Sequence, residues 1–160
     1  MDVTLRPARP DDAGTIASLI RELAVFEKLE DQAKATADDL RRHLFGDRPA
    51  AEVILAEVGG AVVGFALFFP TFSTFRGQPE IYLEDLFVRP EHRGRGIGKA
   101  ILARLAWIAV DRGCGRLEWA VLDWNRPAIG FYRSLGAVPM DEWTVYRVVD
   151  PALGRLAVEG

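Results

Sequence analysis

Cysteine and histidine are scarce in this sequence, and both absences restrict the class of protein. Cys114 is the one cysteine among 160 residues, so no internal disulfide can form, as is usual in a reducing cytoplasm. It lies between two glycines without an acid–base motif, which argues against a cysteine nucleophile. His43 and His92 have no Cys or Asp cluster around them of the kind that holds a metal ion. We therefore expect a cytoplasmic protein that uses no metal.

Long apolar runs and an excess of positive charge are lacking as well. The longest apolar stretch, residues 61–69, is too short to cross a bilayer, and the charged amino-terminal MDVTLRPARPDD is unlike a secretory signal. The net charge of −3 argues against general nucleic-acid binding. A composition of 49% hydrophobic and 27% charged residues suits a well-packed core. No repeat or linker divides the chain, which predicts a single domain over residues 1–160.

Residues 80–113 predict a strand, a tight basic loop and a helix. Residues 80–88 alternate between apolar and polar and are rich in Ile, Tyr, Leu, Phe and Val, which favours a half-buried strand. Pro90 ends this strand, because proline cannot donate to a ladder. From Ile97 the apolar residues recur with a helical period, and Gly113 is expected to end the helix.

The loop of this stretch, R-G-R-G-I-G at residues 93–98, is typical of an anion-binding site. Its three glycines let the backbone approach a bulky anion, and the positive end of the following helix favours negative charge. Arg93, Arg95 and Lys99 add full positive charges. The G-x-G-x-G spacing differs from the dinucleotide fingerprint G-x-G-x-x-G, and no Walker phosphate loop occurs. Both facts argue against a nucleotide-binding module.

Local signals predict an α/β (α+β) fold with a mixed, mostly antiparallel central sheet flanked by helices. Gly59-Gly60 joins two strand-like runs as a hairpin, and Pro70 is expected to close the second run. The strand–helix–strand unit of residues 80–122 implies one parallel pair. In chain order we expect strands at 3–8, 52–58, 61–69, 80–88, 116–122 and 143–149, and helices at 13–29, 36–45, 97–112 and 127–135.

Two motifs around the loop resemble those of a known superfamily. The loop follows a strand ending in Leu-Phe-Val, and W-N-R-P-A-I-G-F-Y occupies residues 124–132. Together they resemble the GNAT superfamily of acetyl-CoA-dependent N-acetyltransferases. Y-L-E-D-L-F-V at residues 82–88, with A-V-L-D-W-N at 120–125, is similar to the diamine and thialysine branch, which includes spermidine/spermine acetyltransferase-like proteins. The resemblance implies a GNAT fold, acetyl-CoA as co-substrate, a small-molecule amine acceptor (a diamine, thialysine or a lysine-like amine), direct attack in a ternary complex, and a homodimer.

The resemblance also implies roles for individual residues. Tyr132 would be the general acid that protonates the coenzyme A thiolate, and Glu84 would bind the acceptor amine and remove its proton through water. Neighbouring strand residues point to opposite faces, so only one of Glu84 and Asp85 is expected to face a given pocket, and Asp85 is interpreted as structural. The residues expected to hold the coenzyme are Leu86, Phe87, Val88, Arg93, Gly94, Arg95, Gly96, Ile97, Gly98, Lys99, Asn125 and Tyr132, and those expected to hold the acceptor are Phe26, Glu27, Glu84 and Trp143.

The loop before the central strand departs from the pattern of polyamine-acetylating relatives. Residues 71–75 contain neither an acid nor a tryptophan, and those relatives carry both. A short diamine, thialysine or a lysine-like amine is therefore at least as suitable as a long polyamine. Two alternatives stay open: acetylation of a protein N-terminus or lysine on the same scaffold, and an acyl-CoA-binding sensor without turnover. The presence of Tyr132 argues against the sensor.

Overall fold

The computed structural model describes residues 2–159. Its internal contacts divide the chain into two compact units, residues 1–122 and residues 123–160. The first unit holds a central sheet with helices on both faces, and the second unit is helical and irregular. The expectation of one domain over residues 1–160 stays a prediction.

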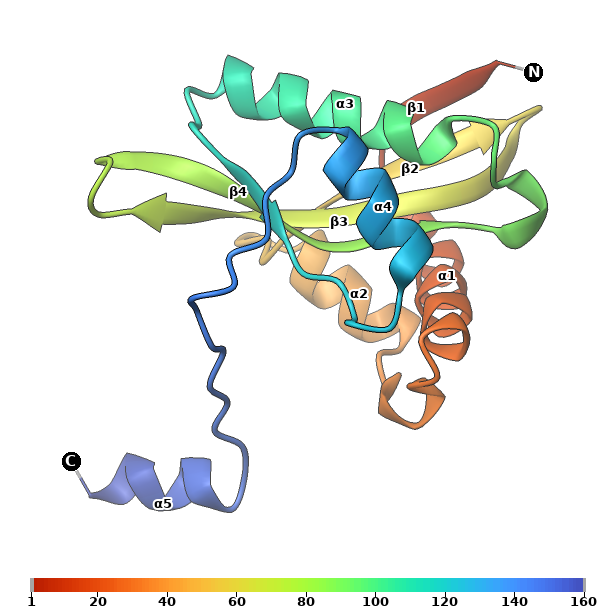
Figure 1. The fold of residues 1–160 in the computed structure, drawn as a ribbon. Helices are drawn as coiled ribbons and strands as arrows, with labels where there is room; N and C mark the ends of the chain where they lie inside the picture. Colours follow the sequence, from red (N-terminus) through yellow and green to blue (C-terminus); the bar gives the residue numbers. More distant parts are fainter. Residues whose placement is uncertain (1, 160) are drawn as a thin grey trace. The chain divides into compact units, whose positions relative to one another are not determined.

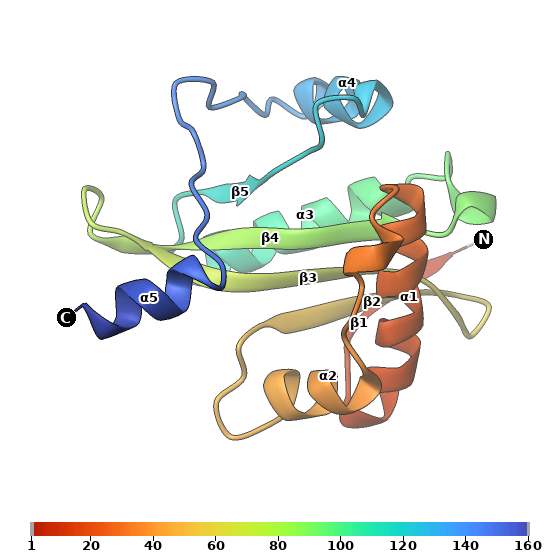
Figure 2. The ribbon, with the colours of Figure 1, turned by 90° about the horizontal axis from the view of Figure 1, so that it is seen from below.

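The sheet of the first unit is mixed and mostly antiparallel, which confirms the expected fold class. β1 (Val3–Pro7), β2 (Glu52–Val58), β3 (Ala61–Ser73), β4 (Gln78–Val88) and β5 (Leu117–Trp119) lie side by side in that order (Figures 1 and 2). Neighbouring strands are antiparallel except β4 and β5, which run parallel. A strand–helix–strand crossover produces such a parallel pair. β5 is shorter than the predicted strand at residues 116–122.

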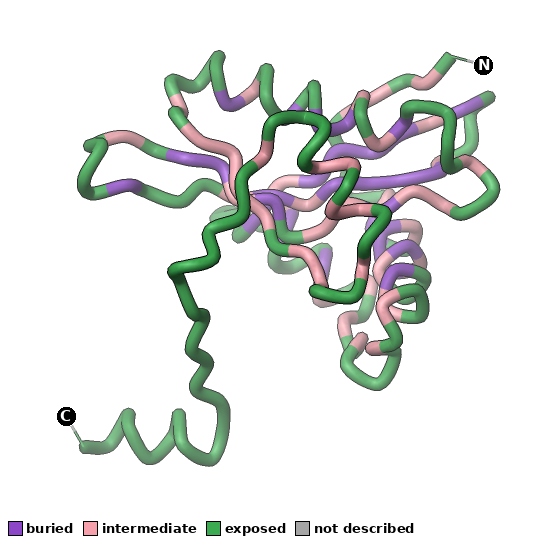
Figure 3. The backbone as a smooth tube through the Cα atoms, in the orientation of Figure 1, coloured by how far each residue is buried: buried purple, intermediate pink, exposed green. Residues whose placement is uncertain are grey.

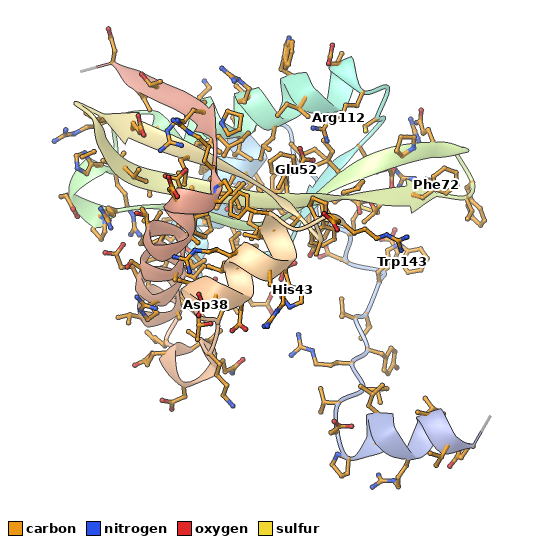
Figure 4. The ribbon with its side chains drawn as sticks, turned by 180° about the vertical axis from the view of Figure 1, so that it is seen from behind. Asp38, His43, Glu52, Phe72, Arg112 and Trp143 are labelled. Carbon is orange, nitrogen blue, oxygen red and sulfur yellow. The ribbon has the colours of Figure 1, made fainter. Side chains whose placement is uncertain are left out.

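The hairpin of β3 and β4 is longer than expected, because Pro70 does not close β3. β2 pairs with β3 only as far as Phe68, so the next part of β3 has a free edge where a proline without an N–H is tolerated. Pro70 lies opposite Ile81 in the β3–β4 ladder. Residues 71–75 were predicted as a loop, but β3 continues to Ser73 and the hairpin turn follows it. This end of β3 carries Phe72, which is 65% exposed and labelled in Figure 4.

The helices of the first unit cover both faces of the sheet. α1 (Ala13–Phe26) and α2 (Ala37–Leu44) lie on one face and α3 (Ile97–Asp111) on the other (Figure 1). The predicted start of α2 is confirmed, because Thr36 and Asp39 exchange the two hydrogen bonds of a capping box at 3.1 and 3.0 Å. Short 3₁₀ turns lie at Pro10–Asp12, Glu30–Gln32 and Pro90–His92.

Apolar side chains fill the space between the sheet and the α1–α2 face. Ile16 and Leu19 of α1 meet Leu55, Phe65 and Phe87 of the strands, and each of these side chains is at most 3% exposed. Burial of one such side chain stabilises the fold by roughly 1.5–3 kcal/mol. Figure 3 shows that buried residues follow the strands and the inner sides of the helices. This packing fixes the positions of the strands of the first unit.

A bidentate salt bridge ties α3 to the sheet at the far end of the helix. Arg112 directly follows the last residue of α3. Its guanidinium donates to both carboxylate oxygens of Glu52 at 2.7 and 2.8 Å (Figure 4). Gly113 follows with a φ of 72°, so it is the left-handed residue that ends the helix, as predicted.

The second unit contains α4 (Arg126–Ser134) and α5 (Ala152–Val158). Asn125 caps α4 by accepting a hydrogen bond from the Ala128 N–H at 3.4 Å. The predicted strand at residues 143–149 is wrong, since within residues 123–159 the structure forms no strand. Alternating side chains alone do not make a strand, because the backbone groups also need a neighbouring strand as hydrogen-bond partner.

Candidate active site

The glycine-rich loop presents its backbone to open space. Gly94 and Gly96 have φ values of 73° and 79°, a conformation that other residues rarely adopt, and Gly96 directly precedes α3. A Cβ added at Gly94, Gly96 or Gly98 would meet no heavy atom within 4 Å. The first-turn N–H groups of α3 therefore lie directly after a loop whose glycines face open space. Such a site fits the pyrophosphate of a coenzyme A molecule.

The charged side chains of this loop do not all point the same way. Arg93, Arg95 and Lys99 are all exposed. Arg93 lies back over the end of β4, where its Nε donates to the Val88 carbonyl at 2.8 Å. Its guanidinium carbon lies 4.5 Å from the Phe26 ring centroid and 5.4 Å from that of Phe87. Desolvation by these neighbours lowers the pKa of Arg93 from its usual value, and an arginine remains charged there.

One edge of β4 is left without a strand beside the loop. β5 pairs with β4 only from Ile81 to Leu83, whereas β3 continues along β4 to Val88. The Arg89 N–H bonds the Val63 carbonyl of β3, so by alternation the backbone groups of Val88 and Leu86 face the open edge. The Arg93 contact to the Val88 carbonyl agrees with this direction. An extended amide-bearing chain such as pantetheine can add to an edge of this kind.

A β-bulge at Glu84 changes the direction of the side chains on β4. Leu67 of β3 lies opposite Asp85, but the next residue, Phe68, lies opposite Leu83, so Glu84 has no partner in the ladder. Two β4 residues thus occupy the place of one. The simple alternation expected from the sequence does not hold here, and it does not separate the carboxylates of Glu84 and Asp85.

The charges of Glu27 and Glu84 act on the Asp85 carboxylate around this bulge and the end of α1. The pKa of Asp85 is raised to about 6, first by burial and then by the negative charges of Glu84 and Glu27. Burial also raises the pKa of Glu27, which directly follows α1. Tyr82 lies nearby, since burial and then the charges of Glu84 and Glu118 raise its pKa. An ammonium group is the natural ligand of such a cluster, and a carboxylate with a pKa near 6 can accept its proton.

Asp85 is the functional candidate that the sequence analysis missed. Strand alternation assigned it to the opposite face from Glu84, and only the register of β3 against β4 reveals the bulge. The one available signal was the unusual pair of adjacent acids inside an apolar strand. The largely buried Asp85 carboxylate carries a desolvation cost, and such a cost is often retained for function.

The remaining predicted site residues lie in the second unit. The Asn125 side chain is engaged as the cap of α4. Tyr132 lies on α4 with its ring centroid 5.7 Å from that of Phe131. Trp143 is 75% exposed, and its backbone N–H donates to the Met140 carbonyl at 3.2 Å. The roles expected of these residues toward coenzyme and acceptor stay predictions.

Within residues 2–159, no group of three or more His, Cys, Asp or Glu side chains is arranged to hold a metal ion. Over the same range, every helix is too short or too polar to cross a membrane.

Comparison with known proteins identifies the family. Residues 18–137 match the model of the Acetyltransferase (GNAT) family. A thialysine N-epsilon-acetyltransferase of Bos taurus is 42% identical, with 97% of each chain covered. An L-ornithine N5-acetyltransferase of Arabidopsis thaliana is 33% identical over 93% of this chain and 85% of that protein. A solved integron cassette protein from the mobile metagenome of V. cholerae superimposes with a TM-score of 0.83 at 30% identity, covering 98% of each chain.

The fold and the loop thus define an acyltransferase scaffold. The chain belongs to the GNAT family of acetyltransferases. Within the family it is similar to the thialysine N-epsilon-acetyltransferases, and the predictions of the GNAT fold, of an N-acetyltransferase enzyme and of this branch are confirmed. Membership implies acetyl-CoA as the co-substrate.

Proposed function

We propose that this enzyme transfers the acetyl group of acetyl-CoA to a primary amine of a small molecule, in the class of thialysine, lysine-like amino acids and short diamines. The observation that carries the proposal is the carboxylate cluster of Glu27, Glu84 and Asp85 beside the open edge of β4. The printed activities of the similar proteins, toward thialysine and ornithine, support the same class of acceptor.

The chemistry requires a free amine, a held thioester and a proton for the leaving sulfur. Acetyl-CoA supplies the thioester. Glu27 and Glu84 hold the acceptor ammonium, and Asp85 takes its proton, directly or through the water proposed for Glu84. The amine nitrogen then bonds the carbonyl carbon as the carbon–sulfur bond breaks. Tyr132 gives its phenolic proton to the sulfur, and the second proton lost by the nitrogen as the amide forms restores the phenol through solvent. The loop of residues 93–99 with the edge of Leu86–Val88 holds the coenzyme.

The β3–β4 hairpin favours a short acceptor over a long polyamine. Its tip carries Phe72 and Phe75, which are 65% and 100% exposed, and residues 71–75 include no carboxylate. A polyamine has further ammonium groups that need acidic partners along its length. The carboxylates described above lie around the end of α1 and the bulge, which suits an acceptor whose charges are close together.

The test is release of free coenzyme A thiol from acetyl-CoA, measured with thialysine, lysine, ornithine, putrescine, spermidine, a short lysine peptide and no acceptor. We expect strong release with one or more of the amino acids or putrescine. Release only with the peptide would favour the alternative function, acetylation of a protein N-terminus or lysine. Tight acetyl-CoA binding with no release from any acceptor would favour the sensor.

We also retain two predictions about the cellular form of the enzyme. A homodimer is supported by apolar side chains of the second unit that are largely exposed, such as Val145 at 90% and Tyr146 at 91%, because association with a second chain would bury such side chains. Light scattering at low and high salt measures the mass directly.

A cytoplasmic location is supported by the single cysteine, and fractionation of cells that express the tagged chain tests it.

A further inference from the structure

Two arginines, one just before the glycine-rich loop and one at its first position, contact one face of α1. Arg89 and Arg93 are four residues apart, and so are their targets on α1, Glu22 and Phe26. Arg89 Nε donates to Glu22 Oε2 at 3.0 Å. The Arg93 guanidinium carbon lies 4.5 Å from the Phe26 ring centroid. Residues four apart on a helix lie one above the other, so both arginines meet a single stripe of α1.

The second of these contacts joins the two halves of the proposed site. Arg93 belongs to the glycine-rich loop, and its Nε also donates to the Val88 carbonyl on the open edge of β4. Phe26 is the last residue of α1, and Glu27, a member of the carboxylate cluster, follows it directly. The Glu27 N–H still bonds the Leu23 carbonyl of the helix at 2.9 Å, so Glu27 moves with the last turn of α1.

From this geometry we propose that Arg93 is a positioning residue for the acceptor site: through its stack on Phe26 it holds the end of α1, and with it Glu27, against the coenzyme loop. The proposal rests on the proposed function for the meaning of Glu27, and it adds a role that the loop motif alone does not contain. The phosphate-facing part of the loop is then its backbone with Arg95 and Lys99, whereas the Arg93 side chain serves the amine. A substitution of Arg93 should therefore change the KM for the acceptor.

The experiment compares three loop variants with the wild-type enzyme. Arg93→Met keeps the apolar stem and removes the cation, and Arg93→Lys keeps a charge for the ring but loses the planar guanidinium. Arg95→Met is the matched control, because it removes an exposed arginine of the same loop. The readouts are the KM for acetyl-CoA and for the best acceptor, kcat, and the hydrogen-exchange rates of the N–H groups at residues 27–29.

For Arg93→Met we expect the acceptor KM to rise about thirtyfold and the exchange at residues 27–29 to become about thirtyfold faster, the lower end of the combined size of one exposed cation–π contact and one charged hydrogen bond. The acetyl-CoA KM should change by less than about threefold, and Arg93→Lys should restore part of both effects, since a cation over the ring is regained. Arg95→Met should show the reverse, a raised acetyl-CoA KM with normal exchange at residues 27–29.

A raised acetyl-CoA KM for Arg93→Met, with an unchanged acceptor KM and unchanged exchange, would make Arg93 a phosphate ligand and overturn the proposal. The exchange measurement needs no turnover, so it separates the two claims. If the wild-type enzyme acetylates none of the amines, the proposed function fails, while faster exchange in Arg93→Met alone still supports the link between the loop and α1. Unchanged exchange refutes that link whatever the activity.

Discussion

Replacement of Asp85 by Asn should make the enzyme more stable and far less active. The pKa of the Asp85 carboxyl is raised from 3.8 to about 6, first by burial and then by the charges of Glu84 and Glu27. A shift of about 2 units at roughly 1.36 kcal/mol per unit means that the ionised carboxylate lowers the free energy of unfolding by up to about 3 kcal/mol at neutral pH. Asn removes the charge and keeps the size and polarity of the side chain.

The sign of the pH dependence follows from the raised pKa. Below about pH 4 the carboxyl is protonated in both the folded and the unfolded chain, so Asp85 contributes no difference there. Between about pH 4 and 6 the unfolded chain loses its proton first, and the stability of the wild-type protein declines as the pH rises. The advantage of Asp85→Asn should therefore be near zero at about pH 4 and complete above about pH 6.

Thermal unfolding followed by circular dichroism measures the stability. For a chain of this size about 3 kcal/mol corresponds to a rise in Tm of roughly 5–10 °C at pH 7.5. Asp12→Asn is the matched control of opposite sign, because the Arg6 guanidinium, 2.8 Å away, holds the pKa of Asp12 below its usual value. Loss of the Asp12 carboxylate should lower Tm at neutral pH, and this effect should disappear toward low pH.

The activity readout uses the same variant. In the wild-type enzyme kcat/KM for the acceptor should fall as the pH drops through about 6, where Asp85 gains its proton. Asp85→Asn should lack this acidic limb and lose on the order of a hundredfold or more in kcat. A variant with a lowered Tm and an intact acidic limb would show that the Asp85 carboxylate is held by stabilising partners and is no base, which would refute the reasoning.

Three further predictions concern the other parts of the site. Tyr132→Phe should lower kcat by about a hundredfold, with an acetyl-CoA Kd close to that of the wild type by calorimetry, because only the proton donor is removed; full turnover would assign the acid elsewhere. Gly96→Ala should cost roughly 1–2 kcal/mol in chemical denaturation, since φ is 79° there, and should raise the acetyl-CoA KM; an unaffected KM would detach this loop from the coenzyme. Glu27→Gln should raise the acceptor KM about fivefold while the acetyl-CoA KM stays the same, and equal changes in both would argue against an acceptor role.

Local signals in the sequence were sufficient for most of the fold. Thr36 caps the start of α2 because a capping box needs only Thr36 and Asp39. Gly59 and Gly60 make their hairpin turn because their φ values of 59° and 81° suit glycine. The GNAT loop was readable for the same reason, since its glycines, charges and following helix are contiguous in the chain. Features of this kind depend on a few neighbouring residues and on nothing far away.

The features that were missed depend on pairing between distant segments. The bulge at Glu84 exists only in the register of β4 against β3, and the extension of β3 past Pro70 depends on where β2 stops pairing. Alternation at residues 143–149 is present in the sequence, yet a strand needs a partner, and residues 123–159 supply none among themselves. The contact of Arg93 with Phe26 joins residues 67 positions apart, so no spacing rule predicts it.

On the proposed assignment, the position of the bulge lets a single strand serve both substrates. β5 leaves β4 after Leu83, and the next residue is the bulged Glu84. The open edge proposed for the coenzyme therefore begins at the bulge, beside the carboxylates proposed for the acceptor. Leu86 follows Glu84 by two residues, or about 7 Å of strand. On the proposed assignment the amine and the thioester arrive at adjacent points of one rigid backbone, which supplies the proximity that direct transfer in a ternary complex requires.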